Sequence, residues 1–177
     1  MNVGGISESY AAANFTNHSL SSAGPSTAWT VNLKNATFGS SNINTANNTF
    51  AYIDTASSMI ELSQADYKPM FDLFFSLPDM TCGNSGFGKT FMWDSCFSNT
   101  TQCEYYRTYY ASYFPDIVVT LDDIQYTIPS SAYLVDNVAN NVSPFCSVMI
   151  QQTASGSAGI ILGLPFLRQY YTYFDYD

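Results

Sequence analysis

Basic residues are scarce in this sequence. Its 177 residues include 5 Lys and Arg against 14 Asp and Glu, which gives a formal net charge of −9. Proteins that bind nucleic acid need a positively charged surface to neutralise the phosphate backbone. An anionic membrane surface also attracts clusters of Lys and Arg. The charge balance therefore argues against nucleic acid and against a membrane surface as partners.

Histidine and the common cofactor motifs are also nearly absent. His18 is the single histidine, so zinc sites built from two or three histidines are excluded, and a Ser-His-Asp triad would have to use His18. Neither GxxxxGK[ST] nor GxGxxG occurs. The longest apolar run, Ala158 to Leu164, is far shorter than the roughly 20 residues that span a bilayer. We expect no cofactor and no membrane span.

Apolar residues, in contrast, are plentiful. They make up 46% of the chain and aromatic residues 16%, which is enough for a buried core and excludes a disordered chain. The length fits one domain or one half of a two-lobed protein. Short β-branched and aromatic runs between Ser, Asn and Gly predict a mostly β fold with a few short helices. The expected strands are Trp29–Leu33, Phe50–Ile53, Met59–Leu62, Ile117–Leu121, Ile124–Ile128, Ser147–Gln152 and Tyr170–Phe174.

Helix signals are fewer than strand signals. Ser63 is a candidate helix cap, but Pro69 interrupts the pattern, so we expect this helix to begin near Lys68. Ser130–Tyr133 and Leu164–Arg168 are expected to form one short helical segment each.

Four cysteines and six glycosylation sequons point to the secretory pathway. The cysteines form no CxxC pair, so two disulfides are favoured over a metal site; they are Cys82, Cys96, Cys103 and Cys146. The N-x-[ST] sequons predict N-linked glycans at Asn14, Asn17, Asn35, Asn47, Asn99 and Asn141. We expect an extracellular or vacuolar/lysosomal location. The first residues contain no signal peptide, so we expect the chain to be a segment of a longer protein.

One candidate site stands out at the end of an expected strand. Asp54 follows the apolar run Ala51–Ile53 and precedes Thr55, Ala56 and Ser57. Such a pattern holds a carboxylate in a tight loop, where hydroxyl groups can donate hydrogen bonds to it. A plain hairpin with a solvated aspartate would show the same pattern.

Motifs that follow one another in order from Gly4 to Asp175 resemble the pepsin-like aspartic peptidases. Residues 160–175 (IILGLPFLRQYYTYFD) are similar to the closing motif of that family. Residues 114–121 (FPDIVVTL), followed by IQY and SAY, resemble a second family motif. Gly4-Gly5-Ile6 with Ser9-Tyr10 and the strand at 29–33 supply the others. The resemblance is to the C-terminal lobe alone. It implies one lobe of the double-psi β-barrel fold over residues 1–177, an inserted disulfide loop at about 78–102, and no N-terminal lobe.

The resemblance also implies roles for individual residues. Asp54 matches the catalytic aspartate of the lobe, Thr55 a hydroxyl that contacts the opposing lobe, and Ser57 a hydroxyl that hydrogen-bonds the aspartate. Cys103 and Cys146 match the disulfide of the lobe, which leaves Cys82 to pair with Cys96.

Ala56, where the family has Gly, leaves more than one function open. The first is an aspartic endopeptidase, in which this chain joins an N-terminal lobe from the same protein or another chain and acts on peptide substrates. The second is a non-catalytic pseudo-peptidase glycoprotein with a structural, assembly or binding role. A homodimer that pairs Asp54 with Asp54 is a third arrangement. In the first two cases the isolated chain is expected to be inactive.

Overall fold

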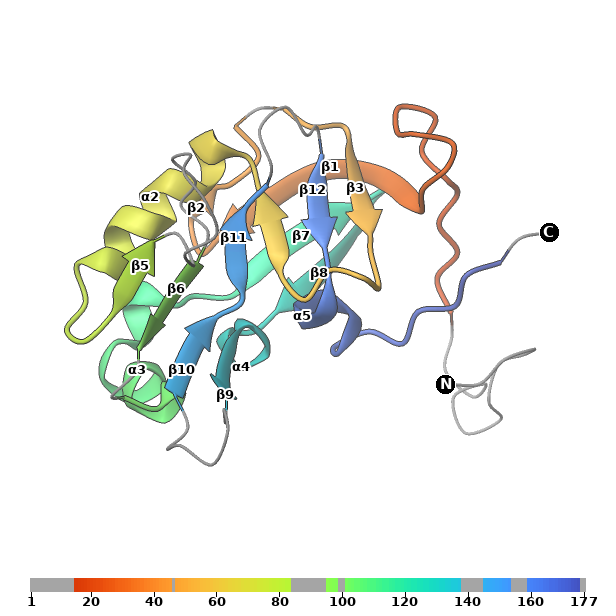
Figure 1. The fold of residues 1–177 in the computed structure, drawn as a ribbon. Coiled ribbons are helices and arrows are strands. Elements are labelled where there is room, and N and C mark those ends of the chain that lie inside the picture. The colour runs from red at the N-terminus through yellow and green to blue at the C-terminus, as the bar shows by residue number, and fades with distance from the viewer. Residues whose placement is uncertain are drawn as a thin grey trace.

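The computed structural model describes residues 15–45, 47–83, 95–98, 101–137, 145–153 and 159–175. Strands dominate it, and a few helices lie beside and below them (Figure 1). The strands form one sheet of eight and one of four. This architecture confirms the mostly β, single-lobe fold expected from the sequence. In the described part of the chain, no helix has the length and apolar character needed to cross a membrane.

The eight-stranded sheet carries the candidate site. Its order is β11-β4-β12-β3-β1-β7-β8, with β2 paired to β1. β12 lies between β3 and β4, parallel to β3 and antiparallel to β4, so the sheet is mixed. The strands are β1 (Thr30–Phe38), β2 (Ser41–Asn42), β3 (Phe50–Ile53), β4 (Ile60–Leu62), β7 (Ile117–Leu121), β8 (Ile124–Ile128), β11 (Ile150–Gln152) and β12 (Ile160–Leu162).

The four-stranded sheet has the order β5-β6-β10-β9. Its strands are β5 (Thr81–Gly83), β6 (Ser95–Ser98), β9 (Leu134–Asn137) and β10 (Phe145–Val148). The single strand expected over Ser147–Gln152 is wrong, because the chain changes sheets between β10 and β11. Between them, the Met149 N–H donates to the Tyr133 carbonyl at 2.6 Å instead of joining a ladder. β5 and β6 come from the expected inserted loop.

The largest helix begins earlier than the proline suggested. α2 spans Gln64–Phe75 and contains Pro69. Ser63 caps it: its hydroxyl accepts the Asp66 N–H at 3.3 Å and donates to the Asp66 carboxylate at 2.7 Å. The expected start near Lys68 is therefore wrong. The cap and the buried face offset the cost of an interior proline; the buried residues of α2 are Asp66, Tyr67, Met70, Phe71 and Phe74.

The remaining helices are short. They are α3 (Cys103–Tyr109), α4 (Ser130–Tyr133), α5 (Leu164–Leu167) and the 3-10 turn η1 (Ala111–Tyr113). The helical segments expected at Ser130–Tyr133 and Leu164–Arg168 are confirmed, the second ending one residue earlier. In the core, the Tyr133 hydroxyl donates to the Pro115 carbonyl at 2.6 Å, and burial raises the pKa of Tyr133.

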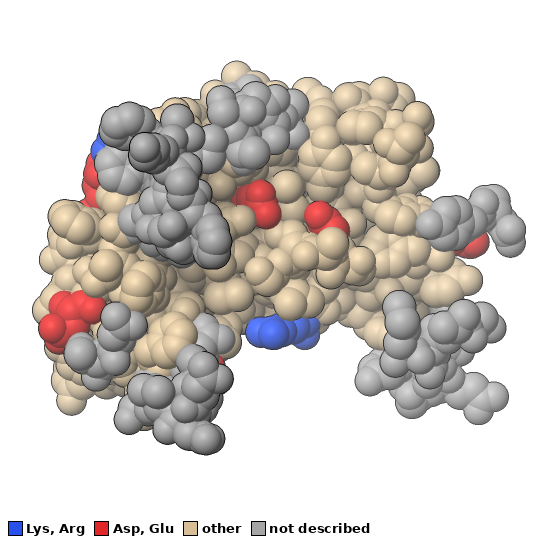
Figure 2. Space-filling view, in the orientation of Figure 1, with Lys and Arg blue, Asp and Glu red and all other residues tan. Residues whose placement is uncertain are grey.

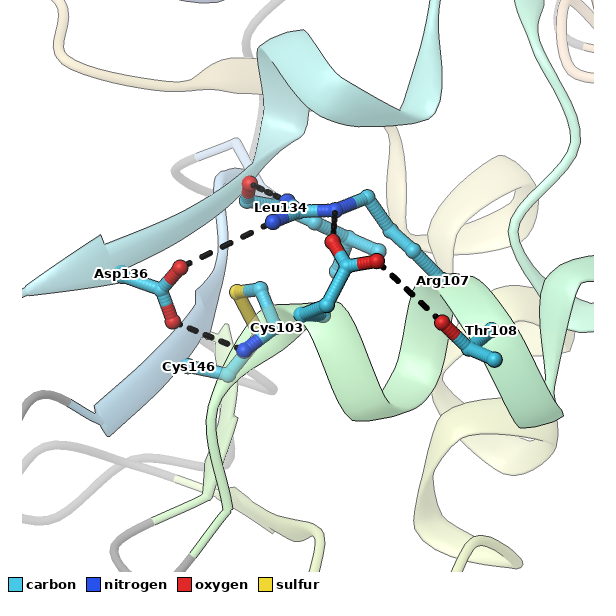
Figure 3. Close-up of polar contacts among 7 residues, drawn as sticks. Cys103, Arg107, Thr108, Leu134, Asp136 and Cys146 are labelled. Atoms are coloured by element: carbon cyan, nitrogen blue, oxygen red, sulfur yellow. Dashed lines mark hydrogen bonds and ion pairs between the residues drawn. A yellow bond between two sulfur atoms is a disulfide. The ribbon is translucent and has the colours of Figure 1, made fainter.

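Two disulfides hold the smaller sheet together. Cys82–Cys96 joins β5 to β6, and Cys103–Cys146 joins the start of α3 to β10. These are the pairs that the resemblance implied. Beside the second disulfide, Asp136 accepts the Cys103 N–H at 2.7 Å, and Arg107 lies 3.7 Å from the same carboxylate (Figure 3). The arrangement attaches α3 to β9 as well as to β10.

The last residues do not form the expected strand. In the part of the chain that the structure describes, Tyr170–Phe174 pairs with no strand, so that prediction is wrong. Side chains anchor the segment instead. The Tyr170 hydroxyl accepts the Thr127 N–H at 2.8 Å and donates to the Thr127 carbonyl at 2.9 Å on the edge strand β8. The Phe174 ring packs on Trp29 with centroids 4.9 Å apart.

A polar cluster centred on His18 attaches the segment before β1 to the β7–β8 hairpin. The imidazole Nδ1 lies 2.6 Å from Asp122 Oδ2, and Nε2 lies 2.7 Å from the Tyr126 hydroxyl. The Asn32 side chain donates to Asp122 Oδ1 at 2.9 Å. Hydrogen bonds from Asn32 and His18 lower the pKa of Asp122. Asp122 has φ of 51°, a left-handed conformation that Asp tolerates in a tight turn.

This cluster predicts a pH-dependent contribution to stability. Because the folded-state pKa of Asp122 is lowered, its contribution is present above the unfolded value of about 3.9 and is lost as the pH falls through the folded value. We expect Asp122→Asn to lower the free energy of unfolding by about 1 kcal/mol at neutral pH, allowing for solvent exposure.

Denaturant titrations at neutral pH and at about pH 2.5 measure this difference, which should nearly vanish at the lower pH. Asp123→Asn is the matched control, since Asp123 is the exposed neighbour in the same turn and pairs with the exposed Lys34. A loss of unfolding free energy in Asp122→Asn that is the same at both pH values would contradict this role of the Asp122 carboxylate.

Candidate functional site

Asp54 begins a tight loop, residues 54–59, that we call the Asp54 loop. The residue directly follows β3, and its N–H donates to the Leu162 carbonyl of β12 at 3.2 Å. The Ala56 N–H donates to Asp54 Oδ1 at 2.8 Å. The side chain of Asp54 is half-buried, whereas Thr55 and Ala56 are exposed. The sheet thus fixes the backbone of the aspartate and leaves its carboxylate accessible.

Gly163 lets the end of β12 pass directly beneath the Asp54 loop. A Cβ at this position would lie 2.4 Å from the Met59 carbonyl oxygen and 2.5 Å from the Ser57 carbonyl oxygen. Just beyond it, the Leu164 N–H donates to the Ser57 carbonyl at 3.0 Å. Since the opposing atoms belong to the backbone, a side chain here would displace the loop that carries Asp54.

We therefore expect Gly163→Ala to lower the free energy of unfolding by about 2 kcal/mol, because the added methyl group must push two backbone carbonyls away. Ser58→Ala is the matched control: Ser58 is an exposed residue of the same loop, and its substitution should stay within about 0.5 kcal/mol. Equal stability of Gly163→Ala and Ser58→Ala in urea titrations would show that the close contact imposes no constraint.

The Ser57 hydroxyl is bound within the loop and to β4. Its one proton can go to the Met59 carbonyl at 3.0 Å or to the Glu61 carboxylate at 3.1 Å, and its oxygen accepts the Met59 N–H at 3.2 Å. The resemblance implied a hydrogen bond from Ser57 to Asp54, and the hydroxyl instead faces these other groups. Glu61 was missed from the sequence. The sequence signal that could have identified it is a charged residue inside an otherwise apolar strand.

The sequons divide into exposed positions and positions outside the described residues. Asn17, Asn35 and Asn47 are exposed, so their side chains are accessible for a glycan. Asn14, Asn99 and Asn141 lie outside the described residues.

Charged side chains give no further candidate centre. Over the described residues, no group of three or more His, Cys, Asp and Glu side chains is arranged to hold a metal ion. Figure 2 shows acidic side chains at separate positions on one face, most of which is uncharged. At the Asp54 loop, a sequence motif, the end of β3 and an accessible carboxylate coincide, so this loop is the candidate site.

The chain is similar to known proteins of one family. A family model described as eukaryotic aspartyl protease matches residues 1–177. Pepsin A of Canis lupus familiaris is 46% identical over 61 residues, which are 34% of this chain and 15% of that protein. Pepsin A of Callithrix jacchus is 44% identical over 64 residues, 36% of this chain and 16% of that protein. Pepsin II-1 of Oryctolagus cuniculus is 41% identical over 61 residues, 34% of this chain and 15% of that protein.

These alignments span less than a fifth of the length of each relative. The family model, in contrast, extends over the whole chain. The match agrees with the mostly β lobe and the two disulfides described above. The chain therefore belongs to the eukaryotic aspartyl protease family and is pepsin-like.

Proposed function

We propose that this chain is the C-terminal lobe of an aspartic endopeptidase and supplies Asp54 as one of its two catalytic carboxylates. The placement of Asp54 carries the proposal. Its backbone is fixed to β12, Oδ1 accepts the Ala56 N–H at 2.8 Å, and the carboxylate stays accessible. Thr55 is exposed beside it, where a hydroxyl can contact a second lobe.

The chemistry needs a second carboxylate from outside this chain. Two carboxyl groups about 3 Å apart cannot both ionise, so they share one proton. The ionised partner then takes a proton from water as the water attacks the peptide carbonyl, and the protonated partner donates to the developing oxyanion. We propose that an N-terminal lobe, in the same protein or in another chain, supplies the partner. The isolated chain is then inactive.

The alanine at position 56 is compatible with this role. Among the described non-glycine residues, positive φ occurs at Asn47, Asp79 and Asp122, so Ala56 is outside the left-handed region that favours glycine. Its side chain is exposed. The methyl group therefore imposes no backbone strain on the lobe, and its N–H still donates to Asp54.

A second candidate is a pseudo-peptidase glycoprotein in which the lobe has a structural, assembly or binding role. The position of the Ser57 hydroxyl, bound to Met59 and Glu61 instead of Asp54, favours it. The sequons at exposed Asn17, Asn35 and Asn47 would suit such a protein as well.

The disulfides and the family support passage through the secretory pathway, where disulfides persist. We propose an extracellular or vacuolar/lysosomal destination, with N-linked glycans on exposed sequons. Intact mass of the protein from its native source, before and after glycosidase treatment, tests this part. An unchanged mass would contradict it.

The test of the activity compares the full two-lobed protein with the isolated chain on an acid-denatured protein substrate. We expect cleavage with an acid optimum by the full protein alone, blocked by a statine-type transition-state analogue whose hydroxyl lies between the two carboxylates. A full protein that neither cleaves the substrate nor binds the analogue would exclude the peptidase and support the pseudo-peptidase.

A further inference from the structure

Glu61 is a charged residue in the middle of a buried strand. On β4 its neighbours Ile60 and Leu62 are fully buried, and strand alternation directs Glu61 to the opposite face. Its paired residues are Gln151 on β11 and Ile161 on β12, both half-buried. Glu61 itself is half-buried, so a hydrogen-bond donor beside its carboxylate replaces part of the water that it loses.

That donor is Ser57, in the Asp54 loop. The hydroxyl has two possible acceptors, the Met59 carbonyl at 3.0 Å and Glu61 Oε1 at 3.1 Å, and its oxygen accepts the Met59 N–H at 3.2 Å. A hydrogen bond to a carboxylate is roughly twice as strong as one between neutral groups. Glu61 therefore links the rigid strand β4, through Ser57, to the backbone of the loop that begins at Asp54.

We propose that Glu61 is a positioning residue for the Asp54 loop and acts through the Ser57 hydroxyl. It holds Ser57 so that the Met59 N–H is satisfied and the loop stays closed over Gly163. In this conformation the Ala56 N–H meets the Asp54 carboxylate. The effect on turnover rests on the proposed function; the effect on the loop does not.

Backbone amide exchange in the full protein tests the loop directly. Glu61→Leu removes the acceptor, whereas Glu61→Gln keeps an acceptor oxygen and removes only the charge. We expect Glu61→Leu to speed exchange of the Met59 amide about five- to tenfold, as the loss of one such hydrogen bond implies, and Glu61→Gln to change it less than about twofold. Gln151→Leu, on the same face of the adjacent strand, is the matched control and should leave this amide unchanged.

A double-mutant cycle with Ser57→Ala identifies the route. Ser57→Ala should reproduce the faster exchange, and adding Glu61→Leu to it should have little further effect. If the two substitutions have additive effects on exchange of the Met59 amide, the proposal is overturned. It is also overturned if Glu61→Leu leaves this exchange unchanged, or if Glu61→Gln speeds it as much as Glu61→Leu does. If Glu61→Leu does not fold, Glu61→Ala takes its place: it also removes the acceptor, should speed exchange at Met59 by the same factor, and would overturn the proposal if exchange there is unchanged.

Kinetics then connect the loop to turnover. We expect Glu61→Leu to lower kcat about tenfold with KM within about twofold, and Glu61→Gln to restore most of kcat. An equal loss in both variants, or a change confined to KM, would overturn the role in turnover. If the wild-type protein cleaves nothing, the proposed function fails, and amide exchange still decides whether Glu61 positions the loop.

Discussion

Asp54→Asn should reduce turnover of the full two-lobed protein by at least about 10³-fold. An amide cannot ionise to act as a base and cannot share a proton with a second carboxylate, so it removes the step that activates water. The substitution changes little else. Its side-chain oxygen still accepts the Ala56 N–H, and the Asp54 N–H still reaches the Leu162 carbonyl.

Steady-state cleavage at acid pH measures this loss, and thermal unfolding of the same variant checks the fold. The melting temperature should stay within a few degrees of the wild type, as expected for an accessible side chain. Asp72→Asn is a matched control, since Asp72 is an exposed aspartate on α2 that pairs with Lys68; it should keep full activity. Turnover that survives Asp54→Asn would refute the catalytic assignment.

Removing the Cys103–Cys146 disulfide should be the most destabilising change in the smaller sheet. The disulfide closes a sequence separation of 43 residues, which corresponds to about 4 kcal/mol of unfolded-chain entropy. The Cys82–Cys96 disulfide closes a separation of 14 residues, which corresponds to about 3 kcal/mol. We expect the paired Ser substitutions at 103 and 146 to cost more than those at 82 and 96.

The burial of the cysteines increases the expected difference in stability between the two double variants. Cys103 and Cys146 are both fully buried, whereas Cys82 is half-buried. A serine at either buried position brings a hydroxyl into an apolar site. Urea unfolding of the two double variants under non-reducing conditions measures both costs. A larger loss at 82 and 96 would show that the β5–β6 hairpin, and not the attachment of α3 to β10, limits the stability of this sheet.

The core strands could be predicted because their signal is local. β3, β7 and β8 have the bounds expected from short β-branched and aromatic runs. Periodicity reports only which face of a segment is buried. It could not show that Tyr170–Phe174 is anchored by side chains, nor that the chain changes sheets at Met149, because both depend on distant backbone partners.

By itself, the sequence determined the mostly β class, the family and the aspartate at the end of β3, because these depend on residue order and on spacing along one strand. Only the tertiary structure decided what surrounds that aspartate. Pairing of β12 with β3 and β4 brings Gly163 beneath the loop and places Glu61 beside Ser57. A hydroxyl has one proton to donate, and the order of nearby residues does not show which acceptor it meets; pairing of β4 with β11 and β12, which are distant in sequence, fixes Glu61 relative to the loop.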